Sequence, residues 1–226
     1  MDKLTLLSHI NIFDELSTND LKMIGQNSTM IPIKKGTQIL VPYEELDVLF
    51  FLKEGQVRLY RLTSEGKQFT TDILVNGNVF GATQSIMLTD QQTYAEAMTD
   101  CNICTMDKEK FEDFIRETPE VSLKLIQTLS NRLKDTYDLS EKIALGDVRF
   151  RTLFLLLKMS EKSGHRHSEG QSIEMKLTHE DIATMVGSSR ESISLLMSKL
   201  KKEGLLKKDR HGYSIKADEL KEILSK

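Results

Sequence analysis

The sequence predicts an α+β protein with three parts in order: a roll of short strands, one long helix, and a helical domain with a β-hairpin. Short β-rich runs separated by glycines fill residues 29–106, as in antiparallel rolls and barrels. No helix breaker occurs between Pro119 and Gly146. A helix, a tight turn and a second helix follow at 178–193, and then a hairpin pattern. We therefore expect a β-roll domain at 1–117, a long helix at 118–145 and a winged helix-turn-helix domain at 146–226.

The composition is that of a soluble globular protein. With 226 residues, 39% of them hydrophobic and 29% charged, the chain can form two modest domains. The longest apolar runs, at 48–52 and 153–157, fall far short of the roughly 18 residues that cross a bilayer. The first residues lack a secretory signal, and two cysteines are too few for a disulfide framework. We expect a cytoplasmic protein with no membrane partner.

Charge is divided unevenly along the chain. Residues 146–226 hold 16 lysines and arginines against 12 acidic residues, whereas the preceding residues hold 15 against 22. A basic domain joined to an acidic one is typical of a protein in which only one domain meets phosphate. A solvated charged surface would give the same balance of charges, so the charge distribution alone does not identify a nucleic-acid-binding domain.

The roll is predicted from runs at 38–41, 57–60 and 69–74, each short and rich in β-formers. Apolar residues at the start of the chain predict short amphipathic helices that cap this domain. The helical positions are Leu4, Leu7, Ile10, Phe13, Leu21 and Ile24, and the turn glycines are Gly36, Gly55, Gly66, Gly77 and Gly81.

The long helix begins well, with Thr118 as N-cap and Pro119 in its first turn. Spacings of 3, 4, 3, 4 and 3 mark the seam of a two-stranded coiled coil, which predicts a homodimer. The alternative is that this stripe packs on the protein's own roll, although Val121, Leu125 and Leu139 could serve that purpose. Gly146 breaks the helix, and Asp147 is the next N-cap. The seam consists of Ile126, Leu129, Leu133, Thr136, Ser140 and Ile143.

A helix-turn-helix is predicted at 178–193 because several independent requirements are met at the right spacing. Thr178 and Ser189 can cap the two helices, Ala183 is small where they cross, and Gly187 can adopt the left-handed turn conformation. The alternative is a helical hairpin with no role in DNA binding. The shared core is predicted to hold Ile182, Val186, Ile193, Leu196 and Met197.

The second helix leaves Arg190, Glu191, Ser194, Leu195 and Ser198 on its outer side. Arginine can bind guanine through two hydrogen bonds, glutamate can accept from the cytosine amino group, and serine can do either. Basic residues and a hairpin at 205–215 follow as a wing for phosphate contacts, although a solvated charged hairpin is the alternative for individual lysines. Further DNA contacts are assigned to Thr178, His179, Ser188, Ser189, Lys199 and Lys202.

With these residues, the chain resembles the family of the cyclic AMP receptor protein and the fumarate-nitrate reduction regulator (CRP/FNR family) over nearly its whole length. The resemblance implies a cyclic-nucleotide-binding-like jelly roll, a dimerisation helix, double-stranded DNA as partner and recruitment of RNA polymerase as an activator. It matches Arg190 and Glu191 to base readers of the first regulator, and Glu191 and Ser194 to those of the second. Leu195 departs from the family, which usually has arginine there. The match is strongest at 182–193 and weaker at 12–13, 16–17, 53–55, 77–81 and 131–133.

The resemblance also locates an effector pocket, but the residues that bind cyclic nucleotides are replaced. The family pattern has Gly-Glu-Leu and then an Arg-Ser or Arg-Thr pair, and no arginine occurs here between Arg61 and Arg116. A buried phosphodiester needs a fixed cation or several amide donors, so cyclic nucleotide is not expected. Two cysteines cannot supply three or four thiolates, so an iron–sulfur cluster is not expected. No haem is expected either. The degenerate pocket consists of Gly81, Ala82, Thr83, Gln91, Gln92, Thr136 and Tyr137.

Cys101 and Cys104 form a C-x-x-C that could be redox-active. Because 99–106 reads as a strand, their side chains should point to opposite faces, and one buried and one exposed thiol is the favoured interpretation. His165 and His167 could bind metal, but a polar surface turn is favoured, and no metal is expected. An unidentified small molecule, a thiol signal or no effector at all remain open.

Two other classes of function are set against DNA binding. The C-terminal domain of a ligand- or thiol-responsive module could bind protein, but that would favour an acidic or apolar recognition face, unlike Arg190, Ser194 and the lysines that follow. An enzyme would need a catalytic arrangement, and the sequence offers no Ser/His/Asp set, phosphate loop or metal-spaced histidine cluster. We predict no catalytic residues.

Overall fold

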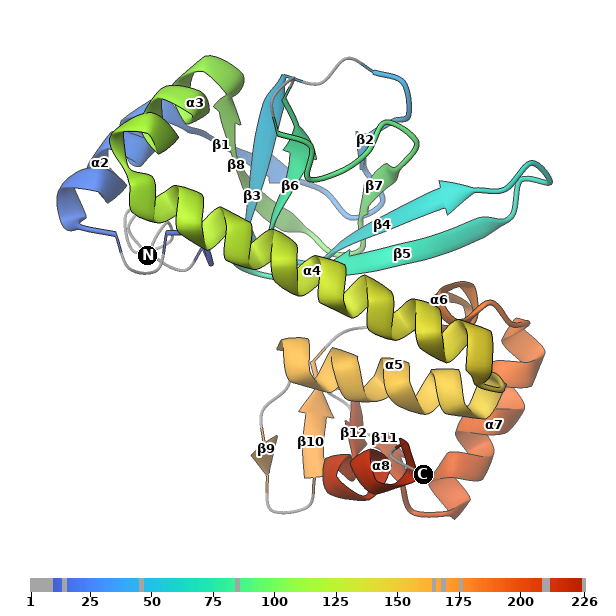
Figure 1. The fold of residues 1–226 in the computed structure, drawn as a ribbon. Coiled ribbons are helices and arrows are strands. Elements are labelled where there is room, and N and C mark those ends of the chain that lie inside the picture. The colour runs from blue at the N-terminus through green and yellow to red at the C-terminus, as the bar shows by residue number, and fades with distance from the viewer. Residues whose placement is uncertain are drawn as a thin grey trace. The chain divides into compact units, whose positions relative to one another are not determined.

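The protein folds into two compact units (Figure 1). The first combines Met1–Leu62 with Thr71–Lys134, and the second combines Thr63–Thr70 with Asp135–Lys226. No helix in the described part of the chain is long and apolar enough to span a membrane. The computed structural model describes residues 10–13, 16–44, 47–83, 86–163, 166–167, 170–174, 177–208 and 212–224.

The β-roll, most of which lies in the first unit, consists of two four-stranded sheets with orders β1-β8-β3-β6 and β2-β7-β4-β5. Neighbouring strands whose register is resolved run antiparallel. The roll predicted from glycine-separated runs is therefore confirmed. Its strands are β1 (Thr29–Ile33), β2 (Gln38–Leu40), β3 (Val48–Glu54), β4 (Val57–Leu62), β5 (Gln68–Leu74), β6 (Val79–Ala82), β7 (Tyr94–Ala97) and β8 (Cys101–Asp107).

Three layers result, because the sheet that contains β3 and β8 is covered on both sides. One core joins the two sheets through residues such as Leu52, Leu59 and Ile103. A second core packs helices on the outer side of that sheet, with Phe51 among its buried residues. The helices are α2 (Thr18–Asn27), α3 (Lys108–Glu117) and the start of α4 (Pro119–Leu145).

The helix expected around Leu21 and Ile24 is α2, whose N-cap is Ser17. Residues 10–13 form a bend and a turn instead of the expected helix, yet Ile10 and Phe13 are buried in the second core. Leu4 and Leu7 lie outside the described residues.

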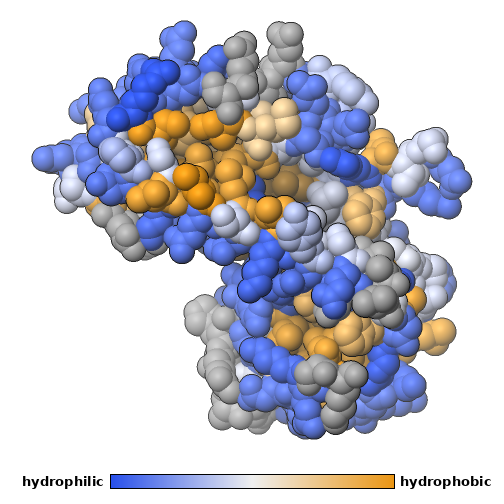
Figure 2. Space-filling view, viewed as in Figure 1, coloured by the Kyte–Doolittle hydropathy of each residue, from blue (hydrophilic) through white to orange (hydrophobic). Residues whose placement is uncertain are grey.

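The long helix α4 has two different faces, as its sequence predicts. Val121 and Leu125 are buried against the roll. Three of the predicted seam residues, Ile126, Leu129 and Leu133, are 59%, 38% and 52% exposed. Figure 2 shows apolar side chains gathered over the part of this face where the first half of α4 runs. Thr136 and Ser140 are also exposed, and the side chains of Leu139 and Ile143 lie outside the description.

After the long helix, the next helix begins where Asp147 accepts a hydrogen bond from the Phe150 amide at 2.7 Å, as expected of an N-cap. The segment at 165–170, expected to be a turn, contributes two short strands to the wing sheet, whose order is β11-β12-β10-β9. His165 and the side chain of His167 lie outside the description. The elements are α5 (Val148–Ser163), β9 (Arg166–His167), β10 (Gly170–Ile173), α6 (His179–Val186), α7 (Arg190–Lys202), β11 (Leu206–Lys208), β12 (Tyr213–Ile215) and α8 (Ala217–Leu224).

Cys101 and Cys104 differ from the favoured interpretation, because both thiols are buried. They do point to opposite faces of β8, since Cys101 lies in the core between the sheets and Cys104 in the core beneath the helices. The expectation of one exposed thiol was wrong because the helices cover the second face. Opposite faces also prevent a disulfide between the two within one chain.

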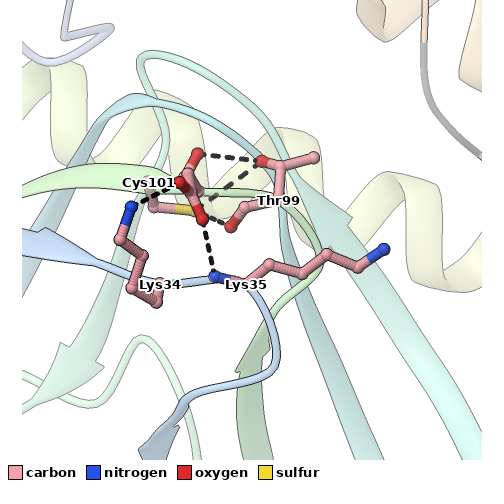
Figure 3. A network of polar contacts seen from close by, with 5 residues as sticks. Lys34, Lys35, Thr99 and Cys101 are labelled. Atoms are coloured by element: carbon pink, nitrogen blue, oxygen red, sulfur yellow. Dashed lines mark hydrogen bonds and ion pairs between the residues drawn. The ribbon is translucent and has the colours of Figure 1, made fainter.

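Burial raises the pKa of the Cys101 thiol, which disfavours the reactive thiolate. A Cβ on Gly55 would lie 2.5 Å from Cys101 Sγ, so this side chain is tightly enclosed. On the surface above it, Asp100 accepts hydrogen bonds from Lys34 Nζ at 2.8 Å and the Lys35 amide at 3.0 Å (Figure 3).

Candidate nucleic-acid interface

The first helix of the interface, α6, is fixed at its start by a reciprocal capping box. The Thr178 hydroxyl accepts from the Asp181 amide at 3.1 Å, and the Thr178 amide donates to the Asp181 carboxylate at 2.8 Å. His179 is the first helical residue and is half-buried. The predicted cap at Thr178 is therefore present, and it fixes the point at which the chain turns into the helix.

The turn between α6 and α7 uses Gly187 in the left-handed conformation, with φ 65° and ψ 52°. The amides of Gly187 and Ser188 both donate to the carbonyl of Ala183, which closes the end of α6. The Ser189 hydroxyl then accepts from the Ser192 amide at 3.1 Å and caps α7. Each special position of the predicted motif thus has its expected backbone role.

The inner side of α7 packs into the domain, and the outer side is open. Ile193, Met197 and Leu200 are fully buried, whereas Leu196 is only half-buried, so its predicted place in the core is corrected. The reason is that Leu196 lies at the border of the two sides. On the outer side Arg190, Glu191, Leu195 and Ser198 are exposed and Ser194 is half-buried. Among the described large apolar side chains of this unit, Leu195 is the most exposed, at 75%.

Basic side chains surround this helix. Lys199, Lys201 and Lys202 follow on α7, and Lys207 and Lys208 stand exposed on β11 of the wing. The ammonium of Lys208 lies 5.1 Å from the centre of the Tyr213 ring. The predicted wing is present as β11 paired with β12, and its turn at 209–211 lies outside the described residues. The acidic residue Glu203, which follows these lysines, has a structural role, because its carboxylate forms an ion pair with Arg149 at 2.7 Å.

The chain segment that contributes to the predicted effector pocket is held together by hydrogen bonds between its own residues. Gly81 has φ +98°, and a Cβ there would lie 2.6 Å from the Val48 carbonyl oxygen, so the glycine is required. Ala82 and Thr83 are buried, and Gln91 and Gln92 are exposed. Of the two residues assigned to this pocket from the long helix, Thr136 is exposed and Tyr137 is 65% exposed.

Asp90 holds this segment together. Its carboxylate accepts from the Gln92 amide at 2.8 Å, from the Thr93 hydroxyl at 3.1 Å and from the Arg61 guanidinium. Burial opposes ionisation, but these hydrogen bonds outweigh it and hold the pKa of Asp90 below its usual range.

Sequence reasoning missed the two arginines that border this segment. Arg61 reaches it from β4, and Arg132 reaches it from α4, where the guanidinium donates to the carbonyls of Val79 at 2.5 Å and Leu88 at 3.4 Å. Both arginines lie outside the stretch between positions 61 and 116 in which the family pattern has its arginine, because they come from other elements. The only signal was the match to the family at 131–133.

The fold and the exposed basic recognition helix define a DNA-binding regulator with a cyclic-nucleotide-binding-like sensor domain. Two family models match: the Crp-like helix-turn-helix domain over residues 151–223 and the cyclic nucleotide-binding domain over 30–118. The chain belongs to the CRP/FNR family of transcription regulators. It is therefore not an enzyme, and the alternative of a protein-binding C-terminal domain is not supported.

Relatives cover nearly the whole chain. The global nitrogen regulator of Nostoc sp. is 25% identical over 198 residues, which cover 87% of this chain and 86% of the relative. The structure of a CooA mutant from Carboxydothermus hydrogenoformans matches with 27% identity and a TM-score of 0.76, covering 93% of this chain and 91% of that one. A CRP/FNR-family regulator from Thermus thermophilus matches with 25% identity and a TM-score of 0.68, covering 88% and 99%.

Proposed function

We propose that this protein is a cytoplasmic homodimer that binds an inverted-repeat operator and regulates transcription by recruiting RNA polymerase. The exposed outer side of α7 carries the proposal, because a capped helix presents Arg190 and Glu191 beside basic residues. Residues 1–117 would receive a signal, 118–145 would dimerise, and 146–226 would bind DNA. The cytoplasm follows from the DNA partner.

The contacts divide into two kinds. Arg190, Glu191, Ser194, Leu195 and Ser198 are assigned to base edges in the major groove. The starts of α6 and α7 offer backbone amides, hydroxyls and the positive end of a helix dipole to phosphate oxygens. Phosphate contacts are assigned to Thr178, His179, Ser188, Ser189, Lys199 and Lys202.

Selection from a random pool of DNA duplexes tests the operator. Two recognition helices related by a dimer axis should enter successive major grooves, so the recovered sequence should be an inverted repeat with half-site centres about 34 Å apart. Each half-site should contain a TGTGA-like or TTGA-like core, with a thymine methyl near Leu195. Recovery of an asymmetric sequence, or no enrichment, would contradict the proposal.

Dimerisation is supported by the exposed apolar stripe on α4. Ile126, Leu129 and Leu133 would be buried against the same residues of a second copy, because a two-fold axis makes the patch self-complementary. The proposed dimer interface would continue along α4 through the remaining seam residues, Thr136, Ser140 and Ile143.

Cyclic AMP is not proposed as the effector. Ala82 replaces the glutamate that would hold a ribose hydroxyl, and the carboxylate of Asp90 already accepts from Arg61, the Gln92 amide and Thr93. A phosphodiester would have to displace that carboxylate, at the cost of three charge-assisted hydrogen bonds. An effector of another kind, a thiol signal through Cys101 or Cys104, or no effector at all remain the alternatives, and neither haem nor an iron–sulfur cluster is proposed.

Calorimetric titration of the full-length protein with cyclic AMP should therefore give no binding heat at physiological concentrations. The Asp90→Asn variant should be titrated in parallel. This substitution removes the negative charge that competes with a phosphodiester, while keeping the shape of the side chain. A micromolar dissociation constant for the unaltered protein would overturn this interpretation of the pocket.

A further inference from the structure

One titratable group of the DNA-binding unit lies at the start of its helix-turn-helix. His179 is the first residue of α6, directly after the capping residue Thr178. The first helix of a helix-turn-helix crosses the DNA backbone, and its start offers donors to phosphate. Of the histidines, only His179 has a side chain within the described part of the chain. At this position a group that titrates near neutral pH would meet phosphate.

Positive charges from two other elements surround this imidazole. Burial lowers the pKa of His179 below its ordinary value, and Lys208 of β11 together with Lys201 and Arg190 of α7 lowers it further. No charged group of α5, which also packs on α6, adds to this shift among the described residues. On its own helix the nearest acids are Glu180 and Asp181, and the Asp181 carboxylate is bound to the Thr178 amide and hydroxyl.

We propose that His179 couples DNA binding to the uptake of a proton, so that the protein holds DNA more tightly as the pH falls. The inference rests on the DNA-binding function proposed above. In the free protein the surrounding cations and the positive end of the α6 dipole favour the neutral imidazole. DNA phosphates bring negative charge to the same place and offset the charge of the lysines and Arg190. Both changes favour the imidazolium, which can then form a charge-assisted hydrogen bond to a phosphate oxygen.

The pH dependence of DNA binding is set by the difference in the pKa of His179 between the free protein and the complex. The pKa of His179 is lower in the free protein than in the complex, so between the two values binding takes up a proton. Affinity therefore rises as the pH falls through that interval and levels off below it.

The test measures dissociation constants by fluorescence anisotropy between pH 5.5 and 8.0 at constant ionic strength. The probes are the inverted-repeat duplex recovered by selection and a random-sequence duplex, because a phosphate contact acts on both. The affinity of the unaltered protein for DNA should rise as the pH falls, by at most about tenfold per recognition domain for each pH unit. This is the limit set by the uptake of one proton. His179→Gln, which keeps an N–H donor but cannot titrate, should flatten the profile. His179→Arg should bind tightly at every pH, and His167→Gln, in β9 of the same domain, should keep the original slope.

Two direct measurements keep the proposal falsifiable if a variant folds poorly. Calorimetry in two buffers of different ionisation enthalpy counts the protons taken up by the unaltered protein. Nuclear magnetic resonance of labelled histidine follows the His179 imidazole in free and DNA-bound protein. An unchanged or lower pKa in the complex, or an unchanged slope in His179→Gln, would overturn the proton linkage while DNA binding persisted. Absence of DNA binding at every pH would instead refute the proposed function itself.

Discussion

The protein that carries Leu129→Glu and Leu133→Glu together should sediment as a monomer. Both side chains are more than one-third exposed in the single chain, at 38% and 52%, so glutamate there costs little folding stability. In a dimer the two substitutions would place four like charges in a desolvated seam. The effective penalty for burying each unpaired charge is several kcal/mol. That sum exceeds what an interface of a few apolar side chains can offset.

The matched control is Met30→Glu, because Met30 is an apolar side chain on β1 with an exposure of 37%, close to that of Leu129. This variant should sediment as the unaltered protein does, and circular dichroism should show the same helix content in all three. If the double variant remains dimeric at the concentrations where the unaltered protein is a dimer, the seam does not run through these residues.

The helix-turn-helix could be predicted from sequence because its determinants are local. Thr178, Gly187 and Ser189 act on backbone groups only three or four residues away, so their spacing fixes their roles. The two faces of α4 were predictable for the same reason, since helical periodicity alone separates Val121 from Leu129. In both cases the information lies within one element and its neighbours.

Features that depend on contacts distant in sequence were missed. The burial of Cys104 depends on a layer of helices that packs on the far face of β8, and no pattern in β8 reveals that layer. Arg132 reaches the carbonyl of Val79 across 53 positions of sequence. The strand β10 was missed because it is held in the wing sheet by its pairing with the distant strand β12, whereas the polar and glycine-containing segment around it is typical of a turn. Such contacts are fixed by tertiary packing, which outweighs local propensity.

Arg190→Ala should weaken binding to the selected operator by roughly 1–3 kcal/mol per half-site and relax the preference at one base position. The physical reason is that a guanidinium in the major groove donates to both acceptors of a guanine, and alanine leaves those acceptors without a partner. Arg190 is exposed on the first turn of α7, so the substitution leaves the packing of the domain intact. The loss over two half-sites, roughly 2–6 kcal/mol, corresponds to a factor of about thirty or more in affinity.

Lys202→Ala is the matched control, because Lys202 is an exposed cation at the other end of the same helix and is assigned to phosphate alone. It should weaken binding to every sequence alike and lower the salt dependence by about one counterion. Both variants would be measured against a panel of single-base operator changes at two salt concentrations. A base reader alters the ranking of the panel, whereas a phosphate contact shifts every member equally and more strongly at low salt. If Arg190→Ala lost affinity by the same factor for every member, Arg190 would be a backbone contact, and the sequence preference would have to come from Glu191, Ser194 and Leu195.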